Sequence, residues 1–401
     1  MAEWKRVKLG EICSRICSGG TPKSTCRDYY ENGEIPWLNT KEVHSNRIYG
    51  TENRITQLGL DNSSAKWVKA DSVIVAMYGA TAGNVAQTRI PLTTNQACCN
   101  LEVDSDKASA DFVFYYLRNC YSKLLLLANG AAQQNLNAQV IREYEIPLPP
   151  LPTQRKIAAV LGALDDKIEN NRKICANLEA QAQALFKSWF VDFEPFGGKM
   201  PNGWKLGKLG DLGTIVGGAT PSKANKSFYT ENGIHWVTPK DLSIQQTKFV
   251  SRGEIDITDA GFNAASVRMM PRGSVLFSSR APIGYVAIAK NDICTNQGFK
   301  SVVPNPGVGS EFIYQLLCAN TKLIEERASG STFKEISTAG MRDVPVVVPS
   351  KEVLGKFSNM LSSQSEIQES KEAESRALAA TRDALLPKLM SGEIDVEKVE
   401  V

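Results

Sequence analysis

The strongest constraint on the fold is that the second half of the chain repeats the first. The matches keep an offset of about two hundred residues, far longer than the unit of a solenoid repeat, and so indicate a duplicated domain. The matching strings, first copy against second, are LGEI (9–12) and LGDL (209–212), GGTPK (19–23) and GATPSK (218–223), YYENGEIPWLNTKEV (29–43) and FYTENGIHWVTPKDL (228–242), DSVIVAMYGATAGNVA (71–86) and GSVLFSSRAPIGYVA (273–287), TTNQA (93–97) and CTNQG (294–298), ANG (128–130) and ASG (328–330), and REYEIPLPP (142–150) and RDVPVVVPS (342–350).

Each copy mixes strand and helix patterns. The β-branched, apolar runs at 71–76 and 273–277 are bounded by turn residues, as buried strands are. Residues 110–127 and 311–327 instead carry apolar residues at helical spacing and end at the glycine of ANG or ASG, which is typical of a helix C-cap. We therefore predict an α+β fold made of two duplicated globular α/β domains.

A long helix is predicted after each globular copy. Prolines between 147 and 152 end the first copy, Thr153 is placed as the N-cap, and residues 153–190 would form a helix of about 55 Å. The second helix would end or kink at Pro387. The apolar seams that alternate spacings of four and three are Ile157, Leu161, Leu164, Ile168, Leu178, Leu185 and Trp189 in the first helix, with Asn171, Cys175 and Ala182 in phase, and Phe357, Met360, Ile367, Leu378, Thr381 and Leu385 in the second.

The two helices are expected to pair as an antiparallel coiled coil in a pseudo-twofold molecule. Helices of this kind also serve as simple packing elements or oligomerisation coils. Two duplicated domains alternating with two long helices instead favour a molecule that holds two units a fixed distance apart, as reading a split DNA site requires. The predicted boundaries are 1–150 and 196–350 for the two globular domains, 151–195 and 351–392 for the helices, and 393–401 for a C-terminal tail.

Composition narrows the class of protein. A hydrophobic fraction of 42% predicts a folded chain. A formal net charge of +3 is compatible with nucleic-acid binding but does not by itself indicate it. The start MAEWKRVKLGEI has no apolar signal core and no stretch has the length of a membrane span, so we expect a cytoplasmic protein. Nine cysteines without CxxC pairs, and only two histidines, predict reduced thiols and no metal site.

The order of elements carries a resemblance to a known family. A globular unit, a proline-ended strand, a helix with ALFKSWFVDFEP (184–195), a second unit and a helix ending in LLPKLMSGEI (385–394) together resemble type I restriction-modification specificity subunits over nearly the whole chain. The resemblance implies that each globular unit is a target recognition domain for one half of a bipartite sequence in double-stranded DNA. It also implies that the helices fix the spacing and dock two methyltransferase subunits, with possible restriction or translocase subunits, and that no membrane is involved. S-adenosylmethionine, ATP and Mg would then be bound by partners, with no cofactor on this chain.

The repeated loops supply the candidate DNA-binding residues. Glycine, a hydroxyl and a cation in the GGTPK and GATPSK loops suit phosphate contact, and amides pair well with adenine, although Asn and Gln here are equally suited to capping a strand end. Trp37 and Trp236 are interpreted mainly as core residues. The candidates in both copies are Thr21, Lys23, Asn39, Thr40, Lys41, Asn95 and Gln96, and Thr220, Lys223, Thr238, Lys240, Asn296 and Gln297.

Positions that differ between the copies are candidates for direct base readout, because units reading different half-sites must differ where they touch bases. Arg280 suits the O6 and N7 atoms of guanine. Each of these positions is equally compatible with simple divergence of a surface residue. They are Tyr78, Gln133, Gln134 and Asn135 in the first copy, and Ser279, Arg280, Phe333 and Lys334 in the second.

Catalysis by this chain is not predicted. No glycine-rich cofactor turn with an NPPY-like loop is present, GATPSK lacks the second glycine of a P-loop, and Asp165, Asp166 and Lys167 fall within a predicted helix. The alternative from a different class is a coiled-coil scaffold whose duplicated domains bind proteins. Sensitivity of binding to salt would distinguish the two, because DNA readers gain much of their affinity from phosphate contacts.

Overall fold

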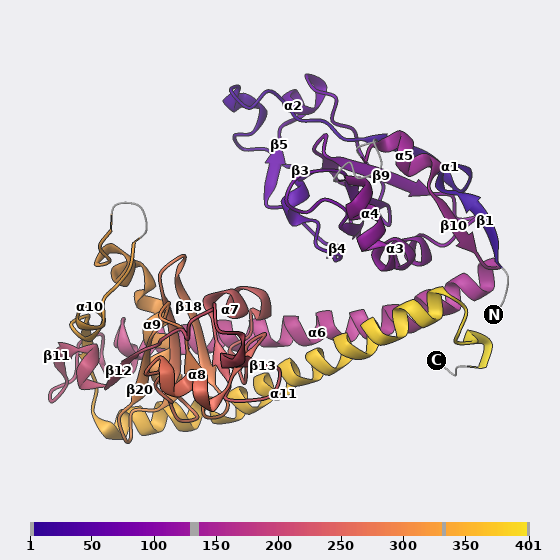
Figure 1. Cartoon of the computed structure of the whole chain (residues 1–401). Coiled ribbons are helices and arrows are strands. Elements are labelled where there is room, and N and C mark those ends of the chain that lie inside the picture. The colour runs from indigo at the N-terminus through magenta and orange to yellow at the C-terminus, as the bar shows by residue number, and fades with distance from the viewer. Residues whose placement is uncertain (1–3, 129–135, 331–333, 399–401) are drawn as a thin grey trace. The chain divides into compact units, whose positions relative to one another are not determined.

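The computed structural model describes residues 4–128, 136–330 and 334–398 (Figure 1). The chain divides into two compact units. Unit 1 comprises residues 1–168 and 377–401, and unit 2 comprises residues 169–376. Each unit therefore contains one globular copy together with a part of each long helix.

The centre of unit 1 is a five-stranded sheet with the order β2-β9-β6-β7-β4. β1 pairs with β10, and β5-β3-β8 form a three-stranded sheet. The strands are β1 (Lys5–Lys8), β2 (Cys13–Ser18), β3 (Ile35–Leu38), β4 (Arg47–Ile48), β5 (Asn53–Ile55), β6 (Val73–Ala76), β7 (Val85–Thr88), β8 (Thr93–Thr94), β9 (Cys98–Val103) and β10 (Glu145–Leu148). The helices are α1 (Leu9–Ile12), α2 (Gln57–Asp61), α3 (Ala110–Asn119), α4 (Tyr121–Ala128) and α5 (Ala138–Glu143).

Unit 2 repeats the central five-stranded sheet and the terminal strand pair, but the counterpart of the β5-β3-β8 sheet is divided into two two-stranded sheets, β13-β16 and β14-β19. Its five-stranded sheet has the order β12-β20-β17-β18-β15, and β11 pairs with β21. The strands are β11 (Lys205–Lys208), β12 (Gly213–Gly217), β13 (Tyr229–Thr230), β14 (Trp236–Val237), β15 (Phe249–Val250), β16 (Asp256–Ile257), β17 (Val275–Ser279), β18 (Ile283–Ala289), β19 (Cys294–Thr295), β20 (Lys300–Pro304) and β21 (Pro345–Val348). The helices are α7 (Pro239–Gln245), α8 (Asp259–Ala264), α9 (Ser310–Glu326) and α10 (Thr338–Arg342).

The matching strand orders confirm the predicted duplication and the α+β class. The central strand β6 is buried at every position, as its β-branched apolar sequence predicts. The predicted helix 110–127 is divided at Cys120 into α3 and α4, whereas its counterpart α9 is continuous. In unit 2 the core includes an aromatic cluster in which the rings of Phe190 and Phe312 lie 4.9 Å apart and those of Phe190 and Phe357 lie 5.0 Å apart.

The two long helices are α6 (Leu151–Phe190) and α11 (Lys351–Met390). Two boundary predictions were wrong. α6 begins two residues before Thr153, because a proline is tolerated in the first turn, where its missing N–H has no helical acceptor. α11 continues through Pro387 to Met390, so Pro387 does not end the helix; only three helical residues follow the hydrogen bond that it removes.

The helices run antiparallel where they meet within each unit. In unit 1, Asp165 of α6 contacts Arg382 of α11 at 2.5 Å, and Thr153, near the start of α6, contacts Glu397, which follows the end of α11, at 3.4 Å. In unit 2, Asn171 Nδ2 donates to Glu374 at 3.0 Å, and the rings of Phe186 and Phe357 lie 6.2 Å apart. Residue numbers rise along α6 as they fall along α11 in both places, which confirms the predicted antiparallel pairing.

The predicted seam of α6 faces inward, but that of α11 is partly wrong. Ile157, Leu161 and Ile168 are buried, and Leu164, Leu178, Leu185 and Trp189 are half-buried. In α11 Phe357 is buried and Leu378 and Leu385 are half-buried. Met360, Ile367 and Thr381 are exposed, because the inward positions are one residue later, at Leu361, Gln368 and Arg382. Because several inward positions of α11 are polar, a search for apolar residues did not identify which of its residues face inward.

The nine cysteines are all free thiols, and Cys98, Cys99, Cys120 and Cys294 are buried. Burial raises the pKa of the Cys98 and Cys99 thiols. Among residues 4–128, 136–330 and 334–398, none of the helices combines the length and the apolar sequence that crossing a bilayer requires.

Candidate nucleic-acid interface

In unit 1 the predicted loops converge on one surface beside β3 and β8. The N–H of Gly20 donates to the carbonyl of Thr94 at 2.8 Å, and the N–H of Asn95 donates to the carbonyl of Leu38 at 3.0 Å. The hydroxyl of Thr21 donates to the side chain of Gln96. Loops that are distant in sequence are thus joined by backbone and side-chain hydrogen bonds, and we call this surface loop cluster 1, comprising residues 19–23, 39–41, 78–83 and 94–97.

The polar side chains of loop cluster 1 mostly form hydrogen bonds within the cluster. Asn95 Nδ2 donates to Asn39 Oδ1 at 2.8 Å, while Asn95 Oδ1 accepts from the N–H of Ala97 at 3.1 Å. Asn39 caps a short 3-10 helix at 40–42 through a capping box with Glu42. The hydroxyl of Thr81 donates to the carbonyl of Thr40 at 2.6 Å, which ties the β6–β7 turn to the same surface.

Unit 2 builds the equivalent surface, loop cluster 2, from residues 218–223, 238–241, 280–284 and 295–298. The N–H of Ala219 donates to the carbonyl of Thr295 at 2.9 Å, and Thr220 donates to the side chain of Gln297. The Trp236 indole N–H donates to the carbonyl of Ala219 at 3.1 Å, as Trp37 does to Gly20 at 2.9 Å. Both tryptophans are buried, so their interpretation as core residues is confirmed.

Loop cluster 2 lines a groove of about 880 Å³. Its lining includes the aromatic residues Tyr229 and Trp236 and is otherwise largely polar or charged. Predicted DNA-binding residues of the second copy gather along it, namely Thr220, Lys223, Thr238, Lys240, Arg280, Asn296 and Gln297. A concave surface with converging cations, amides and hydroxyls is suited to binding a polyanion that offers hydrogen-bonding edges.

The four cations of the groove differ in their pairing. Lys240 contacts Glu254 at 2.7 Å, and this carboxylate raises the pKa of Lys240. Arg280 contacts Glu335 at 3.3 Å. Within the described part of the chain, neither Lys223 nor Lys226 forms an ion pair, so both ammonium groups are available to an anionic ligand. The same holds in loop cluster 1, where Lys41 is paired with Glu52 at 2.6 Å and Lys23 has no acidic partner among the described residues.

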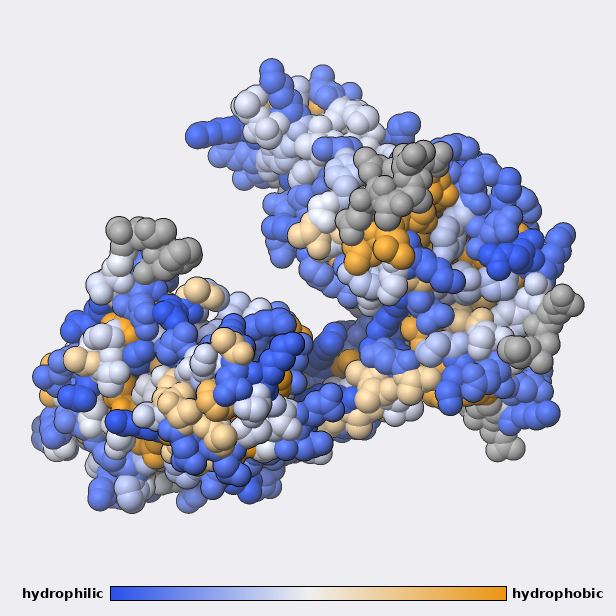
Figure 2. Space-filling model, viewed as in Figure 1, coloured by the Kyte–Doolittle hydropathy of each residue, from blue (hydrophilic) through white to orange (hydrophobic). Residues whose placement is uncertain are grey.

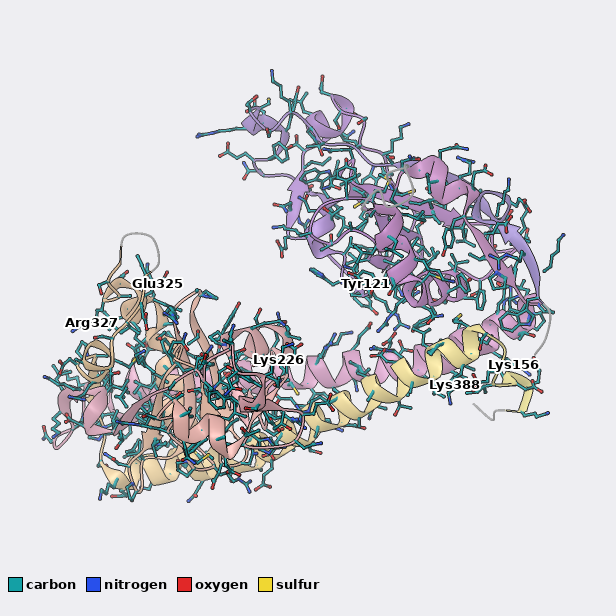
Figure 3. All side chains as sticks on the ribbon, viewed as in Figure 1. Tyr121, Lys156, Lys226, Glu325, Arg327 and Lys388 are labelled. Carbon is teal, nitrogen blue, oxygen red and sulfur yellow. The ribbon has the colours of Figure 1, made fainter. Side chains whose placement is uncertain are left out.

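The two loop clusters differ most beside the turn of one hairpin, β6–β7 in unit 1 and β17–β18 in unit 2. We call this region the hairpin edge. In unit 1 this edge is apolar: Tyr78 is 47% exposed, Leu126 of the adjacent α4 is 60% exposed, and an apolar area is visible over α4 in Figure 2. The backbone of Leu125 approaches Gly83 of the hairpin turn, so α4 and the turn are direct neighbours. In unit 2 the aligned positions on α9 are charged, and Glu325 and Arg327 project from its last turn (Figure 3).

Several predicted site residues have a different role in the structure. Ser279 is fully buried, so it is not positioned for direct readout. Asn95 is buried and bonded to its neighbours, which is the capping role that its residue type also allowed. A Cβ on Gly19 or Gly218 would lie 2.2 or 2.0 Å from the Thr94 or Asn296 region, so these glycines are needed for close packing of the loops. Lys334 is exposed, while Gln133, Gln134, Asn135 and Phe333 lie outside the described residues.

Some residues of these surfaces were not singled out from the sequence. The hydroxyl of Tyr30 donates to the carbonyl of Pro22 at 2.5 Å, and Tyr229 does the same to Pro221 at 2.6 Å, so each tyrosine fastens its TP loop. Both tyrosines stand just before ENG in the repeat, Tyr30 directly and Tyr229 with Thr230 between, which was a usable signal. Glu335 and Lys300 gave no such signal, since Glu335 meets Arg280 and Lys300 only in the folded chain.

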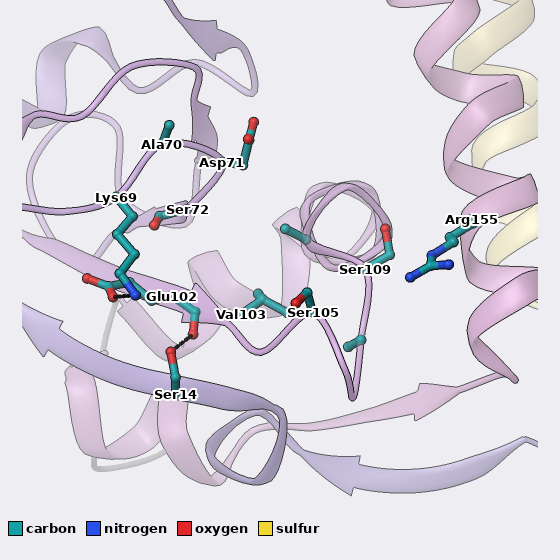
Figure 4. A pocket seen from close by; sticks show the side chains of 12 residues that line it. Ser14, Lys69, Ala70, Asp71, Ser72, Glu102, Val103, Ser105, Ser109 and Arg155 are labelled. Carbon is teal, nitrogen blue, oxygen red and sulfur yellow. Dashed lines mark hydrogen bonds and ion pairs between the residues drawn. The ribbon is translucent and has the colours of Figure 1, made fainter.

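A second cavity of about 290 Å³ lies in unit 1, away from loop cluster 1 (Figure 4). Lys69 lies 3.7 Å from Glu102, the Ser14 hydroxyl donates to the carbonyl of Glu102 at 3.1 Å, and Arg155 reaches toward Ser109 from α6. Its lining contains Lys69 and Arg155 but also Asp71 and Glu102. The groove at loop cluster 2 also contains acids, Glu231, Asp241 and Glu254, but its cations outnumber them and it is the larger of the two, so it is the better anion site.

Each sheet is attached to the long helices by a buried cation. In unit 1, Arg47 of β4 contacts Asp166 of α6 and lies 3.3 Å from the Tyr115 hydroxyl. Nearby, Asp165 accepts from Tyr115 at 2.7 Å and from Arg382 of α11 at 2.5 Å. Burial, and then the charge of Asp165, raise the pKa of Tyr115, so this phenol stays a hydrogen-bond donor.

In unit 2 the cation is Lys248, which directly precedes β15, corresponds in register to Asn46 rather than to Arg47, and is 3% exposed at its side chain. Its ammonium lies 2.7 Å from Glu311 of α9 and 3.4 Å from Glu179 of α6. Glu372 of α11 accepts from the backbone N–H groups of Lys248 and Phe249, both at 3.0 Å. Burial raises the pKa of Glu372, although these two hydrogen bonds oppose the shift.

Comparison with known proteins identifies the kind of chain that has this architecture. The family model described as "Type I restriction modification DNA specificity domain" matches residues 1–180 and 201–374, once over each copy. A crystal structure of a type I restriction-modification S subunit from M. genitalium superposes with a TM-score of 0.60 at 18% identity, covering 96% of both chains. That likeness supports the fold.

Two curated relatives extend the comparison. The chain is 38% identical over 193 residues to the MjaIX specificity subunit of Methanocaldococcus jannaschii, covering 47% of this chain but less than half, 44%, of that protein. It is 25% identical over 470 residues to the HindI specificity subunit of Haemophilus influenzae, covering 98% of this chain and the whole of that protein.

Proposed function

The chain belongs to the family of type I restriction-modification specificity subunits, and from this premise we propose that each loop cluster reads one half of a bipartite DNA target. The boundaries that we propose for the two target recognition domains are 1–150 and 196–350, with helices 151–195 and 351–392 between and after them. The chain itself performs no chemistry on DNA. Its role is to bind the DNA target and to position it for the catalytic partner subunits.

The observation that carries this proposal is the groove of loop cluster 2. Seven residues chosen from the sequence alone as DNA contacts line one groove, although they come from four separated segments of the chain. A duplicated surface with the same hydrogen-bonding plan exists in unit 1. A chain that binds two DNA segments needs two such surfaces.

Within each cluster we assign two kinds of contact. The unpaired ammonium groups of Lys23, Lys223 and Lys226 contact phosphates, which supplies affinity without sequence preference. The exposed amides of Gln96 and Gln297, together with Tyr78 and Arg280, contact base edges or methyl groups in the major groove. Thr21, Thr220, Asn39 and Asn296 hold the loops in position.

We assign the long helices two tasks, spacing the half-sites and docking two methyltransferase subunits. Half-sites read on one face of a duplex must be about one helical turn apart, so a rigid pair of helices is a suitable spacer. S-adenosylmethionine, ATP and Mg would be bound by the methyltransferase and by restriction or translocase subunits. The assembly would act on DNA in the cytoplasm.

The experiment that tests this function is adenine methylation by the full chain co-expressed with its cognate methyltransferase, mapped across a genome by single-molecule sequencing. We expect a split motif with a fixed gap that disappears when this chain is omitted. Methylation that does not depend on the chain would refute the proposal and favour a protein-binding scaffold.

A domain exchange then separates the two clusters. Residues 1–150 are replaced by the matching segment of a relative, and the same map is recorded. We expect one half of the motif to change while the other half and the gap persist. Loss of both halves would contradict independent recognition by two units.

A further inference from the structure

Arg280 belongs to a charged cluster of unit 2 that has no counterpart among the described residues of unit 1. Arg280 Nη1 donates to one carboxylate oxygen of Glu335 at 3.3 Å, and Lys300 Nζ donates to the other at 3.1 Å. At the positions aligned with Arg280 and Lys300, the first copy has Tyr78 and Cys99. The cluster is therefore a feature by which the two copies differ at their hairpin edges.

Glu335 is fixed from both its backbone and its side chain. Its N–H donates to the carbonyl of Ser329 at 2.9 Å, and its own carbonyl accepts from the Ser329 N–H at 3.1 Å. The next residue, Ile336, donates to the carbonyl of Ser279 at 3.1 Å, which ties the segment to the end of β17. The side chain of Lys300 is only 12% exposed, so the carboxylate is held against the hairpin that carries Arg280.

The guanidinium of Arg280 is thus held on one side and open on the other. It lines the groove of loop cluster 2 with Gln297, and its side chain is 37% exposed. Arginine offers five N–H donors, and a bidentate contact with guanine uses two of them. One donor engaged by Glu335 leaves enough for guanine and restricts the rotamers that the long side chain would otherwise sample.

We propose that Glu335, supported by Lys300, positions Arg280 to read a guanine in the major groove of the half-site bound by unit 2. This inference rests on the proposed function and names what that surface recognises. Direct contact of Glu335 with the amino group of cytosine is disfavoured, because Arg280 lines the groove whereas Glu335 is not among its lining residues. Glu335 is a positioning residue, and Arg280 is the contact.

The test uses the full chain in complex with its methyltransferase and a library of duplexes randomised at each position of the mapped half-sites. We expect the wild-type complex to require guanine at one position of one half-site. Arg280→Ala should reduce that preference by about 10- to 100-fold. Glu335→Ala should reduce it by about five- to tenfold, because Arg280 is still present but is no longer held.

Two further variants separate positioning from a general effect on folding. Glu335→Gln keeps the shape and one acceptor, and its preference should lie between wild type and Glu335→Ala. If Glu335→Ala yields no complex, Glu335→Gln decides: a weaker guanine preference supports the proposal, and a wild-type profile overturns it. Asp259→Ala removes another exposed carboxylate of unit 2 and should leave every position unchanged. Relaxation of the same position in this control would overturn the specific role of Glu335.

The outcomes also separate this inference from the proposed function. If methylation by the wild-type complex shows no split motif, the proposed function fails first. If the split motif is present but Arg280→Ala or Glu335→Ala leaves base preference intact at every position, only the positioning role is refuted.

Discussion

Units 1 and 2 share a strand order but fasten their sheets to the long helices with different charges. Arg47 of unit 1 meets Asp166, a carboxylate that is 69% exposed, whereas Lys248 of unit 2, one residue earlier in register, meets Glu179 and Glu311, which are both largely buried. Each unit thus has a buried cation beside its edge strand, but at neighbouring rather than equivalent positions and with different acids. In both units the buried cation has a carboxylate partner, which offsets the cost of removing its charge from water.

The outward edges of the two units differ even more. Tyr78 and Leu126 make the hairpin edge of unit 1 apolar, whereas Arg280, Glu325 and Arg327 make that of unit 2 charged. The loops beneath these edges keep the same hydrogen bonds. Conserved hydrogen bonds within the loops, combined with different side chains at the hairpin edges, are what we expect of two domains that recognise different DNA sequences.

The largest predicted difference concerns the buried cations. Lys248→Ala leaves two acids without a counter-charge in a nearly dry environment and should destabilise unit 2 by about 3–5 kcal/mol. Arg47→Ala releases an exposed acid to water and should cost unit 1 about 1–2 kcal/mol. Native-state hydrogen exchange of the chain in its complex measures both, because it reports opening of each unit separately.

Equal losses of stability in the two units would show that the exposure of the acidic partners does not determine the cost of removing the cation. The matched control is Lys240→Ala, which breaks an exposed ion pair with Glu254. It should leave the exchange of unit 2 unchanged, since exposed pairs contribute little.

The second prediction compares aligned polar positions on the two helices. Asp165→Asn removes the negative charge that contacts both Arg118 and Arg382, although Asp383 still contacts both arginines. We expect it to lower the free energy of unfolding by about 2–3 kcal/mol. Ser365→Ala removes one hydrogen bond to Glu311 and should cost about 1 kcal/mol. Urea unfolding followed by hydrogen exchange should rank them in this order, and a larger loss for Ser365→Ala would contradict it.

The third prediction concerns DNA affinity. Lys23→Ala and Lys223→Ala each remove an exposed, unpaired ammonium group, and each should lower the salt slope of DNA binding by about one without changing the motif. Filter or fluorescence titration at several salt concentrations measures the slope. A change in motif after either substitution would mean that the lysine contacts bases. A change in only one slope would mean that the two loop clusters do not bind phosphates alike.

The smallest effect should be a dependence of stability on pH that is confined to unit 2. Burial raises the pKa of Glu372 above its ordinary value of 4.5, with Arg376 opposing the shift, so the folded chain holds this proton more tightly than the unfolded chain. Stability from this group is present below pH 4.5 and is lost as the pH rises through the folded pKa. Glu372→Gln should flatten that part of the unfolding profile, and an unchanged profile would refute the role of Glu372.

The sequence repeat was sufficient to predict the main architecture. Matching strings implied matching strands, and the two sheets do have the same order. The phase of α11 could not be predicted in the same way. Gln368 and Glu372 face inward because Glu372 accepts the N–H groups before β15, so an apolar pattern read alone selected Met360 and Ile367, which are exposed.

The candidate site was predictable in outline for the same reason. Loops that recur in order belong to one surface, and residues such as Thr220 and Gln297 do meet there. The charged cluster of Arg280 was not predictable, because Glu335 lies 55 residues away and has no matching acid in the first copy.

The sequence by itself determined the duplication, the strand and helix types, and the existence of two equivalent loop surfaces, since repeats and periodicity are written along the chain. Only the tertiary structure decided which charges are neutralised where, as for Lys248 with Glu179 and Glu311. The physical reason is that desolvation depends on what surrounds a side chain from every direction, and residues far apart in sequence supply those surroundings.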